Sequence, residues 1–292
     1  MIIAFYGRQF APEYLKNIQD MVTDLEVITE KFLIHEKLFS FLTENIKFNK
    51  PVEIFSSHNN LNKDIFCLIS IGGDGTLLDT LSLIRDSGIP VLGINTGRLG
   101  FLSAVSAHDV SQATACLINR KFRIDSRSLI HVNSPKEIFD GFAYALNELT
   151  IMKRDTSSMI TIKTSINDKH LNTYWADGLI VATPTGSTGY SLSCGGPIIS
   201  PESQNFIITP IASHNLTVRP IVIPDDTAIK LTIEGRNKDY LLVLDSRSIA
   251  LNESFTFEVK KADFAFNLIY PESTDFYQTI RNKLTWGLDK RN

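Results

Sequence analysis

Cysteine is scarce in this sequence, and its three copies are scattered at Cys67, Cys116 and Cys194. No two of them form a C-x-x-C pair, and an odd count argues against a disulfide framework. The six histidines do not fall at ligand spacing near these cysteines, so the sequence does not indicate a zinc site. This pattern is typical of a reducing compartment, and we expect a cytoplasmic location.

Long apolar runs and an excess of one charge are also missing. No uninterrupted apolar run is long enough to cross a bilayer. The apolar start of the chain lacks a basic leader and a cleavage signal, so Ile2–Tyr6 is predicted to be a first strand. A net charge of −3 over 292 residues creates no global field that would attract nucleic acid or an anionic membrane. An anionic ligand must therefore be held by local backbone donors and a few placed side chains.

Alternating strand and helix patterns in the first third of the chain predict an α/β domain. Ile65–Ile71 and Pro90–Ile94 are apolar segments of strand length, and between them Thr76–Ser87 has apolar residues at helical spacing. Short connections between such elements favour a parallel, Rossmann-like sheet with helices on its faces.

Near residue 125 the pattern changes to the alternation typical of antiparallel strands with one buried face. Ser158–Ile166 and Ala228–Glu234 both alternate, and a polar turn follows each of them. The last stretch, Thr274–Leu288, again has a helical pattern, and we expect this helix to return to the first domain.

We therefore predict two domains. The α/β domain covers residues 1–125, with 268–292 packing back on it, and the β-rich domain covers 126–267. Clefts between such domains are preferred locations for ligand sites.

The loop Gly72–Gly75 surrounds one carboxylate, Asp74, with three glycines, between a predicted parallel strand and a predicted helix. Ligands bind at this position in open α/β sheets, and glycines let a ligand approach the backbone closely. Two common nucleotide motifs are excluded. The third glycine of G-x-G-x-x-G is replaced by Leu78, and the chain has no Gly-Lys pair for a phosphate loop. For this loop alone, a tight turn whose Asp74 caps the helix stays an alternative.

Three further segments carry residues suited to a nucleotide. Asn95–Leu102 also follows a strand, although alone it would be an ordinary turn. Asp177–Pro197 contains a loop of hydroxyls and glycines that offers several donors to an anion without a formal charge. In this segment Tyr190 could stack on a base, and Asp177 could accept hydrogen bonds from ribose hydroxyls or an amide. The pair Asn147–Glu148 could hold a ribose diol, but such a pair is common on protein surfaces.

Taken together, these segments closely resemble the NAD kinase family. The resemblance rests on Gly72–Thr76, Asn95–Leu102, Asn147–Glu148 and the highly specific Asp177–Pro197, in this order along the chain. The G-G-D-G-T loop is shared with lipid kinases and phosphofructokinases. However, the G-T-x-N-D run that lipid kinases of this superfamily carry is absent from the sequence.

The resemblance implies that the γ-phosphoryl group of ATP is transferred to the 2′-hydroxyl of the adenosine ribose of NAD, which gives NADP and ADP. It also implies a divalent cation such as Mg²⁺ with the ATP, and a homodimer or homotetramer. NAD and ATP are the expected partners, without nucleic acid or membrane. Two alternatives stay open: a non-catalytic sensor of NAD or NADP, and a kinase of the same superfamily that acts on another substrate.

By resemblance, Asp74 is the catalytic residue that addresses the acceptor hydroxyl, either as a weak base or as a metal ligand. Asn147 and Glu148 would hold ribose hydroxyls, and Asp177 would line the nucleotide pocket. The full set of nucleotide-binding residues that the resemblance implies is Asp74, Gly75, Asn147, Glu148, Asp177, Thr188, Gly189, Tyr190, Ser191, Leu192, Ser193, Ala212 and Arg247.

Position 79 departs from the family, because Asp79 stands where many members carry a basic residue able to reach a phosphate. The change replaces a positive charge near the site with a negative one. We expect another cation, Arg98 or Lys153, to substitute for it.

Overall fold

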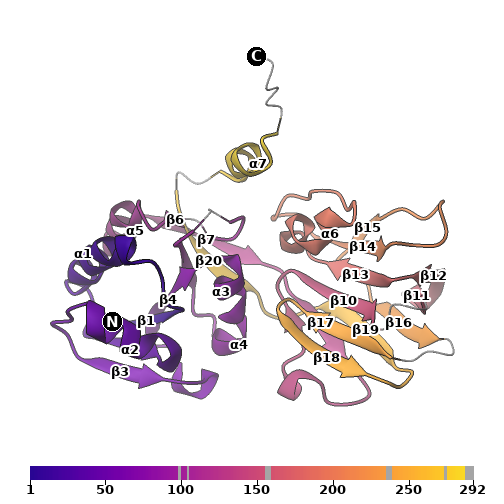
Figure 1. Ribbon diagram of the computed structural model, residues 1–292, viewed down its shortest axis with the longest axis horizontal. Coiled ribbons are helices and arrows are strands. Elements are labelled where there is room, and N and C mark those ends of the chain that lie inside the picture. Colours follow the sequence, from indigo (N-terminus) through magenta and orange to yellow (C-terminus); the bar gives the residue numbers. More distant parts are fainter. Residues whose placement is uncertain (98–99, 104, 155–158, 235–238, 273–274, 287–292) are drawn as a thin grey trace. The chain divides into compact units, whose positions relative to one another are not determined.

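The structure is a computed structural model, and it describes residues 1–97, 100–103, 105–154, 159–234, 239–272 and 275–286. The chain forms two compact units: Met1–Ser126 with Phe266–Asn292 make unit 1, and Arg127–Ala265 make unit 2 (Figure 1). The predicted fold class is confirmed, since unit 1 is α/β with a mostly parallel sheet and unit 2 is β-rich and antiparallel.

Unit 1 is built on an eight-stranded sheet with the order β3-β2-β1-β4-β5-β20-β7, in which β6 pairs with β5. Strands β1, β4 and β5 are buried along almost their whole length, as expected for parallel strands covered on both faces. The strands of this sheet are β1 (Ile2–Gly7), β2 (Lys31–His35), β3 (Val52–Phe55), β4 (Ile65–Gly72), β5 (Val91–Asn95), β6 (Val105–Ser106), β7 (Phe122–Arg127) and β20 (Phe266–Pro271).

Helices and short 3-10 turns connect these strands. The helix α1 presents Ile18, Met21, Val22 and Leu25 at helical spacing to the core of unit 1. Across the described residues, no helix is long and apolar enough to span a membrane. The helical elements of unit 1 are η1 (Pro12–Tyr14), α1 (Leu15–Leu25), α2 (Glu36–Asn45), η2 (His58–Asn60), α3 (Asp74–Asp79), α4 (Leu81–Ile84), α5 (Val110–Ile118) and α7 (Phe276–Leu284).

The strand order reverses between β1 and β4. β2 and β3 lie on one side of β1, whereas β4 and β5 lie on the other, and all these neighbours pair in parallel. Such a switch point leaves a crevice outside the carboxyl ends of the strands, where open α/β sheets bind their ligands. In this unit the loop that begins at Gly72 leaves the sheet at that edge.

The chain returns to unit 1 through a strand that the sequence analysis did not predict. β20 inserts between β5 and β7, and Leu268 pairs with Val91 in parallel register. The predicted C-terminal helix forms as α7, with the Asp275 side chain accepting a hydrogen bond from the N–H of Tyr277 at 3.0 Å. None of the residues of α7 is buried, so β20 is the element that ties this segment to the sheet. Thr274 and the end of the predicted helix lie outside the described residues.

Unit 2 consists of two six-stranded sheets, and the strand pairs of its described residues are antiparallel. The first sheet, in order, is β15 (Ile221–Pro224), β14 (Asn205–Ile211), β13 (Gly178–Ala182), β10 (Glu148–Lys153), β17 (Tyr240–Leu244) and β18 (Arg247–Leu251). The second, in order, is β12 (Lys169–Ala176), β11 (Ile160–Ile166), β16 (Ile229–Glu234), β19 (Thr256–Lys261), β8 (Ile130–Asn133) and β9 (Tyr144–Ala145). The helical elements are η3 (Phe139–Gly141), η4 (Thr185–Thr188) and α6 (Tyr190–Ser193).

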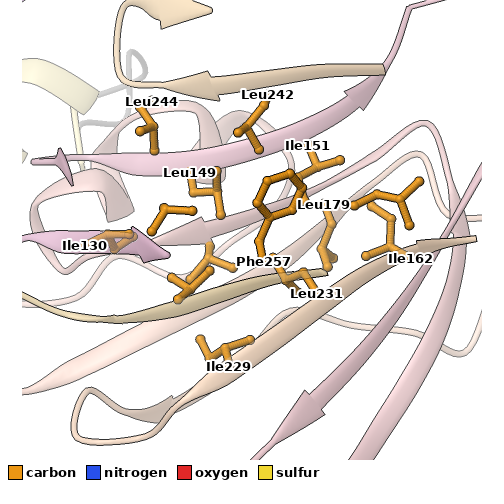
Figure 2. Close-up of a cluster of buried hydrophobic side chains, with 14 of the residues drawn as sticks. Ile130, Leu149, Ile151, Ile162, Leu179, Ile229, Leu231, Leu242, Leu244 and Phe257 are labelled. Carbon is orange, nitrogen blue, oxygen red and sulfur yellow. The ribbon is translucent and has the colours of Figure 1, made fainter. Parts of the chain in front are cut away.

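The core of unit 2 lies between its two sheets. Leu149, Leu179 and Leu242 come from the first sheet, and Leu231 and Phe257 come from the second (Figure 2). The alternation that predicted a strand near residue 229 is present, since Ile229, Leu231 and Ile233 are buried whereas the residues between them are partly exposed. The hydrophobic effect therefore holds the sheets together from their facing sides.

Replacement of Phe257 should be among the costly changes in this core. Phe257→Ala removes a fully buried ring and should lower the free energy of unfolding by about 3–5 kcal/mol, because it leaves a cavity. Denaturant unfolding measures this loss. Val222→Ala, at a side chain that is 42% exposed, is the control and should change stability by less than about 0.5 kcal/mol. Equal effects of the two changes would contradict this account of the core.

Candidate functional site

Two loops of unit 1 meet at the carboxyl ends of β4 and β5. The first follows Gly72 and leads into α3, and the second follows Asn95. The Thr96 N–H donates to the Gly72 carbonyl oxygen at 3.4 Å. The Asn95 side-chain oxygen accepts a hydrogen bond from the Gly97 N–H at 2.7 Å and so tightens the start of the second loop. The structure therefore brings together two motifs that the sequence analysis placed after two strands of the predicted parallel sheet.

The Asp74 side chain connects these two loops through hydrogen bonds. Its Oδ2 accepts hydrogen bonds from the N–H groups of Phe101 at 2.7 Å and Leu102 at 3.2 Å, and its Oδ1 accepts one from Ser103 at 3.1 Å. An ionised carboxylate offers about four acceptor positions. The three loop N–H groups therefore occupy most of these positions. The remaining acceptor position is the one that a ligand hydroxyl would use.

Glycine is required at Gly100 because of this contact. A Cβ atom there would lie 1.7 Å from Asp74 Oδ1, far inside any tolerable distance. Gly72 is constrained differently, because it has a φ of 154° and a Cβ would lie 2.4 Å from Thr76 Oγ1. By contrast, Gly73 and Gly75 have no atom within 4 Å of an added Cβ. The loop motif thus contains two glycines with open space beside them, at the positions that flank Asp74.

Asp79 lies at the other end of α3 and is bound by groups from β1 and the residue after it. Its Oδ2 accepts a hydrogen bond from the Tyr6 hydroxyl at 3.2 Å and lies 3.3 Å from Nη2 of Arg8. Burial, and then the neighbouring Asp79 carboxylate, raises the pKa of Tyr6 to about 12. The negative charge at position 79 therefore has a hydrogen-bond donor and a cation beside it within unit 1.

The expected substitute cations can be compared with the structure in one case. Lys153 Nζ lies 2.6 Å from Asp177 Oδ1 in unit 2, so its charge is paired with a residue that the sequence analysis assigned to the nucleotide pocket. Arg98 lies outside the described residues. The substitution of either cation for a basic residue at position 79 stays a prediction.

In unit 2, one carboxylate fixes the turn that carries Asn147 and Glu148. Asp245 accepts hydrogen bonds from the N–H groups of Leu146 at 2.8 Å, Asn147 at 2.7 Å and Glu148 at 3.2 Å. Asp245 lies between β17 and β18 with a φ of 53°. The sequence analysis missed it because aspartate is common in turns, so nothing in the local sequence sets this one apart.

The loop after β13 packs against the same turn. Thr183 donates from its hydroxyl to the Leu146 carbonyl oxygen at 2.6 Å and from its N–H to the Asn147 carbonyl oxygen at 2.9 Å. At Gly186 a Cβ would lie 2.1 Å from the Asn147 carbonyl oxygen, so only glycine permits this approach. The predicted ribose-binding pair and the hydroxyl-rich loop are therefore neighbours in the structure.

The side chains of Asn147 and Glu148 have unused hydrogen-bonding capacity. Among the described residues, no donor reaches the buried oxygens Asn147 Oδ1 and Glu148 Oε2. Burial, followed by the charge of Asp245, raises the pKa of Glu148 to about 8, although a hydrogen bond from the Tyr190 N–H acts in the opposite direction. Buried polar atoms without partners are costly and mark candidate ligand contacts.

The other predicted residues of this segment differ in what they offer. Tyr190 begins α6 and is 37% exposed, so its ring is available for stacking. Ser191 is fully buried, and its hydroxyl pairs with Thr209 Oγ1 at 2.8 Å. The Thr188 hydroxyl donates to the Thr185 carbonyl oxygen at 3.2 Å. Gly189 lies against Glu148, where a Cβ would be 2.9 Å from Oε2. Leu192 and Ser193 complete the single turn of α6.

Ala212 and Arg247, the last predicted residues, lie at strand ends. Ala212 has a φ of 45°, which is uncommon outside glycine and asparagine. The Arg247 guanidinium donates to the carbonyl oxygens of Phe142 and Tyr144, and it lies 5.3 Å from the centre of the Phe139 ring. Arg247 thus stabilises the segment before the Asn147–Glu148 turn. Its contact with a nucleotide stays a prediction.

Comparisons with known proteins agree with these motifs. A family model described as the ATP-NAD kinase N-terminal domain matches residues 8–122, and one described as the ATP-NAD kinase C-terminal domain matches residues 146–270. The chain is 44% identical over 293 residues to the NAD kinase of Cytophaga hutchinsonii, with 100% of both chains covered. It is 45% identical over 295 residues to the NAD kinase of Flavobacterium psychrophilum, again with 100% of both covered.

Two solved structures share the fold. Yeast NADH kinase complexed with NADH gives a TM-score of 0.87 at 21% identity, over 99% of this chain and 88% of that one. An NAD kinase from Archaeoglobus fulgidus in complex with ATP gives a TM-score of 0.74 at 22% identity, over 98% of this chain and 99% of that one.

Alanine at position 100 should release the loop that Asp74 holds. In Gly100→Ala the new methyl group displaces the carboxylate, so the amides of residues 101–103 should exchange with deuterium about tenfold faster or more. Hydrogen-exchange mass spectrometry measures this directly. Gly75→Ala is the matched control, because its added methyl meets open space. Wild-type exchange in Gly100→Ala would show that Asp74 does not depend on this glycine.

Glutamine at position 148 should stabilise the protein at alkaline pH. Between the ordinary carboxyl pKa of 4.5 and about 8, the folded state keeps the Glu148 proton while the unfolded state releases it. The free energy of unfolding should therefore fall as pH rises through this window. Glu148→Gln is uncharged throughout, so its Tm should increasingly exceed the wild-type Tm between pH 5 and 9.

Thermal unfolding across this pH range tests the prediction for Glu148. Glu202→Gln, which changes an exposed glutamate of the same unit, is the control and should follow the wild type at every pH. If Glu148→Gln followed the wild type as well, Glu148 would not be the proton-binding group described above.

Proposed function

The chain belongs to the ATP-NAD kinase family, and we propose that it transfers the γ-phosphoryl group of ATP to the 2′-hydroxyl of the adenosine ribose of NAD, giving NADP and ADP. Both domain models match in chain order and together span most of the sequence. The observation that carries the proposal is the position of Asp74, an acceptor held rigidly at the carboxyl edge of the sheet, next to the switch point.

Asp74 acts on the acceptor hydroxyl of NAD. Its three N–H partners fix the carboxylate in one orientation, and a remaining lone pair accepts a hydrogen bond from the ribose. Phosphoryl transfer passes through a loose transition state, so positioning and charge stabilisation contribute more than proton abstraction. A carboxylate is therefore adequate here although it is a weak base for an alcohol.

The residues of unit 2 bind the nucleotide. Asn147 and Glu148 hold ribose hydroxyls, and the two oxygens that lack partners among the described residues support this role. Asp177 lines the pocket on the nicotinamide or adenosine side, and Tyr190 stacks on a base with its exposed ring. The Ser191 hydroxyl is already bound to Thr209. Backbone groups of residues 188–193 therefore complete the pocket.

The phosphates of ATP would hold a divalent cation, with Mg²⁺ as the expected ion, and Asp74 is its alternative carboxylate ligand in place of the ribose contact. Among the described residues, no three His, Cys, Asp or Glu side chains cluster as metal ligands. This donor set fits Mg²⁺, which usually keeps several waters and binds through one or two carboxylates and the substrate phosphates. When bound with ATP, the ion neutralises charge on the phosphates.

The family resemblance and the composition also support a setting for the enzyme. We expect it to take part in NADP biosynthesis in the cytoplasm, in line with three scattered cysteines. A homodimer or homotetramer is the expected assembly, which light scattering on the purified protein measures.

Formation of NADP is the direct test. Purified protein with NAD, ATP and Mg²⁺ should form NADP in an NADP-specific cycling assay. Asp74→Asn should lower kcat by roughly two orders of magnitude, as expected for a positioned acid–base group. Asp86→Asn, at an exposed aspartate of the same unit, is the control and should leave kcat unchanged.

Two other outcomes would change the assignment. NAD binding that saturates, without NADP formation from any phosphate donor, would favour the non-catalytic sensor. NADP formation that is equal in Asp74→Asn and in the wild type would remove Asp74 from the mechanism while leaving the reaction in place.

A further inference from the structure

We propose that Asp245 is the positioning residue of the ribose-binding pair, and that it sets Glu148 to act on the nucleotide as a neutral carboxylic acid. This inference rests on the proposed function. Asp245 itself touches no ligand in this account. It acts through the backbone of Leu146, Asn147 and Glu148, which its carboxylate binds with three hydrogen bonds.

The hydrogen bonds of the turn support the positioning role of Asp245. Three consecutive N–H groups converge on one carboxylate at 2.7–3.2 Å, while Thr183 donates to the carbonyl oxygens of Leu146 and Asn147. The turn is thus fixed through both its donors and its acceptors. Its two side chains keep oxygens that are buried and unpartnered within the described part of the chain, which is the arrangement that a ligand diol would complete.

The neutral state of Glu148 follows from the unequal hydrogen bonding of the Asp245 and Glu148 carboxyl groups. Two like charges that interact in a buried site do not both ionise readily, and the group with more donors keeps its charge more easily. Burial raises the pKa of both carboxyl groups, but the three N–H donors of Asp245 and the nearby Arg247 cation act in the opposite direction, whereas Glu148 has the N–H of Tyr190 and also faces the charge of Asp245. Glu148 is therefore the member that carries the proton.

The remaining surroundings of Glu148 do not reverse this order. Cys194, directly after α6, has its thiol pKa raised mainly by burial, so it stays a neutral thiol near pH 8 and adds no charge beside Glu148. A nucleotide that covers Glu148 would remove more water and favour the neutral acid further. As a neutral acid, Glu148 donates its proton to a ribose oxygen and accepts with its other oxygen.

This arrangement predicts a pH dependence for NAD. Since the protonated form binds, the KM for NAD should rise as pH increases through the pKa of Glu148, which is about 8. The KM for ATP should not follow this change. Steady-state kinetics of the full-length wild type between pH 6 and 9.5 measures both constants.

Asp245→Asn separates the two roles of Asp245. The variant keeps one acceptor oxygen but turns an amide donor toward the N–H groups, so at pH 6 the KM for NAD should rise about tenfold, as for the loss of one hydrogen bond. The variant also removes the charge beside Glu148, so the midpoint of the KM increase should move to lower pH. The KM for ATP should stay within about twofold of the wild type.

Asp225→Asn is the matched control, because Asp225 is a second buried aspartate of unit 2 that pairs with Lys261 at 2.7 Å. It should lower the Tm without changing the KM for NAD or the midpoint. A merely structural Asp245 would behave in the same way. If Asp245→Asn left both the KM for NAD and the midpoint unchanged, the inference would be overturned.

If Asp245→Asn does not fold, Thr183→Val provides a second test of whether the turn is positioned for NAD. It removes the hydroxyl that binds Leu146 but no charge, so the KM for NAD should rise about threefold with an unchanged midpoint. An unchanged KM would count against positioning of the turn. Failure of the wild type both to form NADP and to bind NAD in calorimetry would overturn the proposed function as well, whereas normal turnover with unaffected variants overturns this inference alone.

Discussion

In each unit, the candidate functional residues depend on a carboxylate that binds three consecutive backbone N–H groups of a loop. Asp74 holds residues 101–103 in unit 1, and Asp245 holds residues 146–148 in unit 2. Loops lack the regular hydrogen bonds of helices and strands, so their N–H groups need other partners. Charged acceptors are strong ones, and each carboxylate thereby fixes a segment that carries family motifs.

The same interaction restricts which residue type fits at one neighbouring position and changes the pKa at another. The approach of Asp74 excludes every side chain at Gly100. Burial, and then the charge of Asp245, raises the pKa of Glu148 to about 8. Fixing a loop with a carboxylate therefore has a different consequence in each unit. In unit 1 it restricts the residue type at position 100, and in unit 2 it helps to raise the pKa of Glu148.

The sequence predicted whatever depends on local periodicity or on strand order. The parallel and antiparallel sheets follow from apolar patterns, and Gly72 and Asn95 meet because carboxyl ends of neighbouring parallel strands share an edge. Contacts between distant residues were not predictable. Asp245 lies 97–99 residues from its partners, and β20 pairs with β5 across more than half of the chain. Neither leaves a periodic signal at its own position.

Asp79 shows why a single departure from a family pattern has to be interpreted together with its neighbours. Taken alone, an acidic residue near a phosphate site adds repulsion. In the structure, however, Asp79 accepts a hydrogen bond from Tyr6 and lies 3.3 Å from the Arg8 guanidinium. The Arg8 side chain is 74% exposed and follows directly on β1, the strand beside the switch point. Its charge offsets that of Asp79 at short range, so the local field at this edge of the sheet depends on both residues. Because the Arg8 side chain is exposed, solvent screens this pair, and the charge at position 79 acts mainly on its close neighbours.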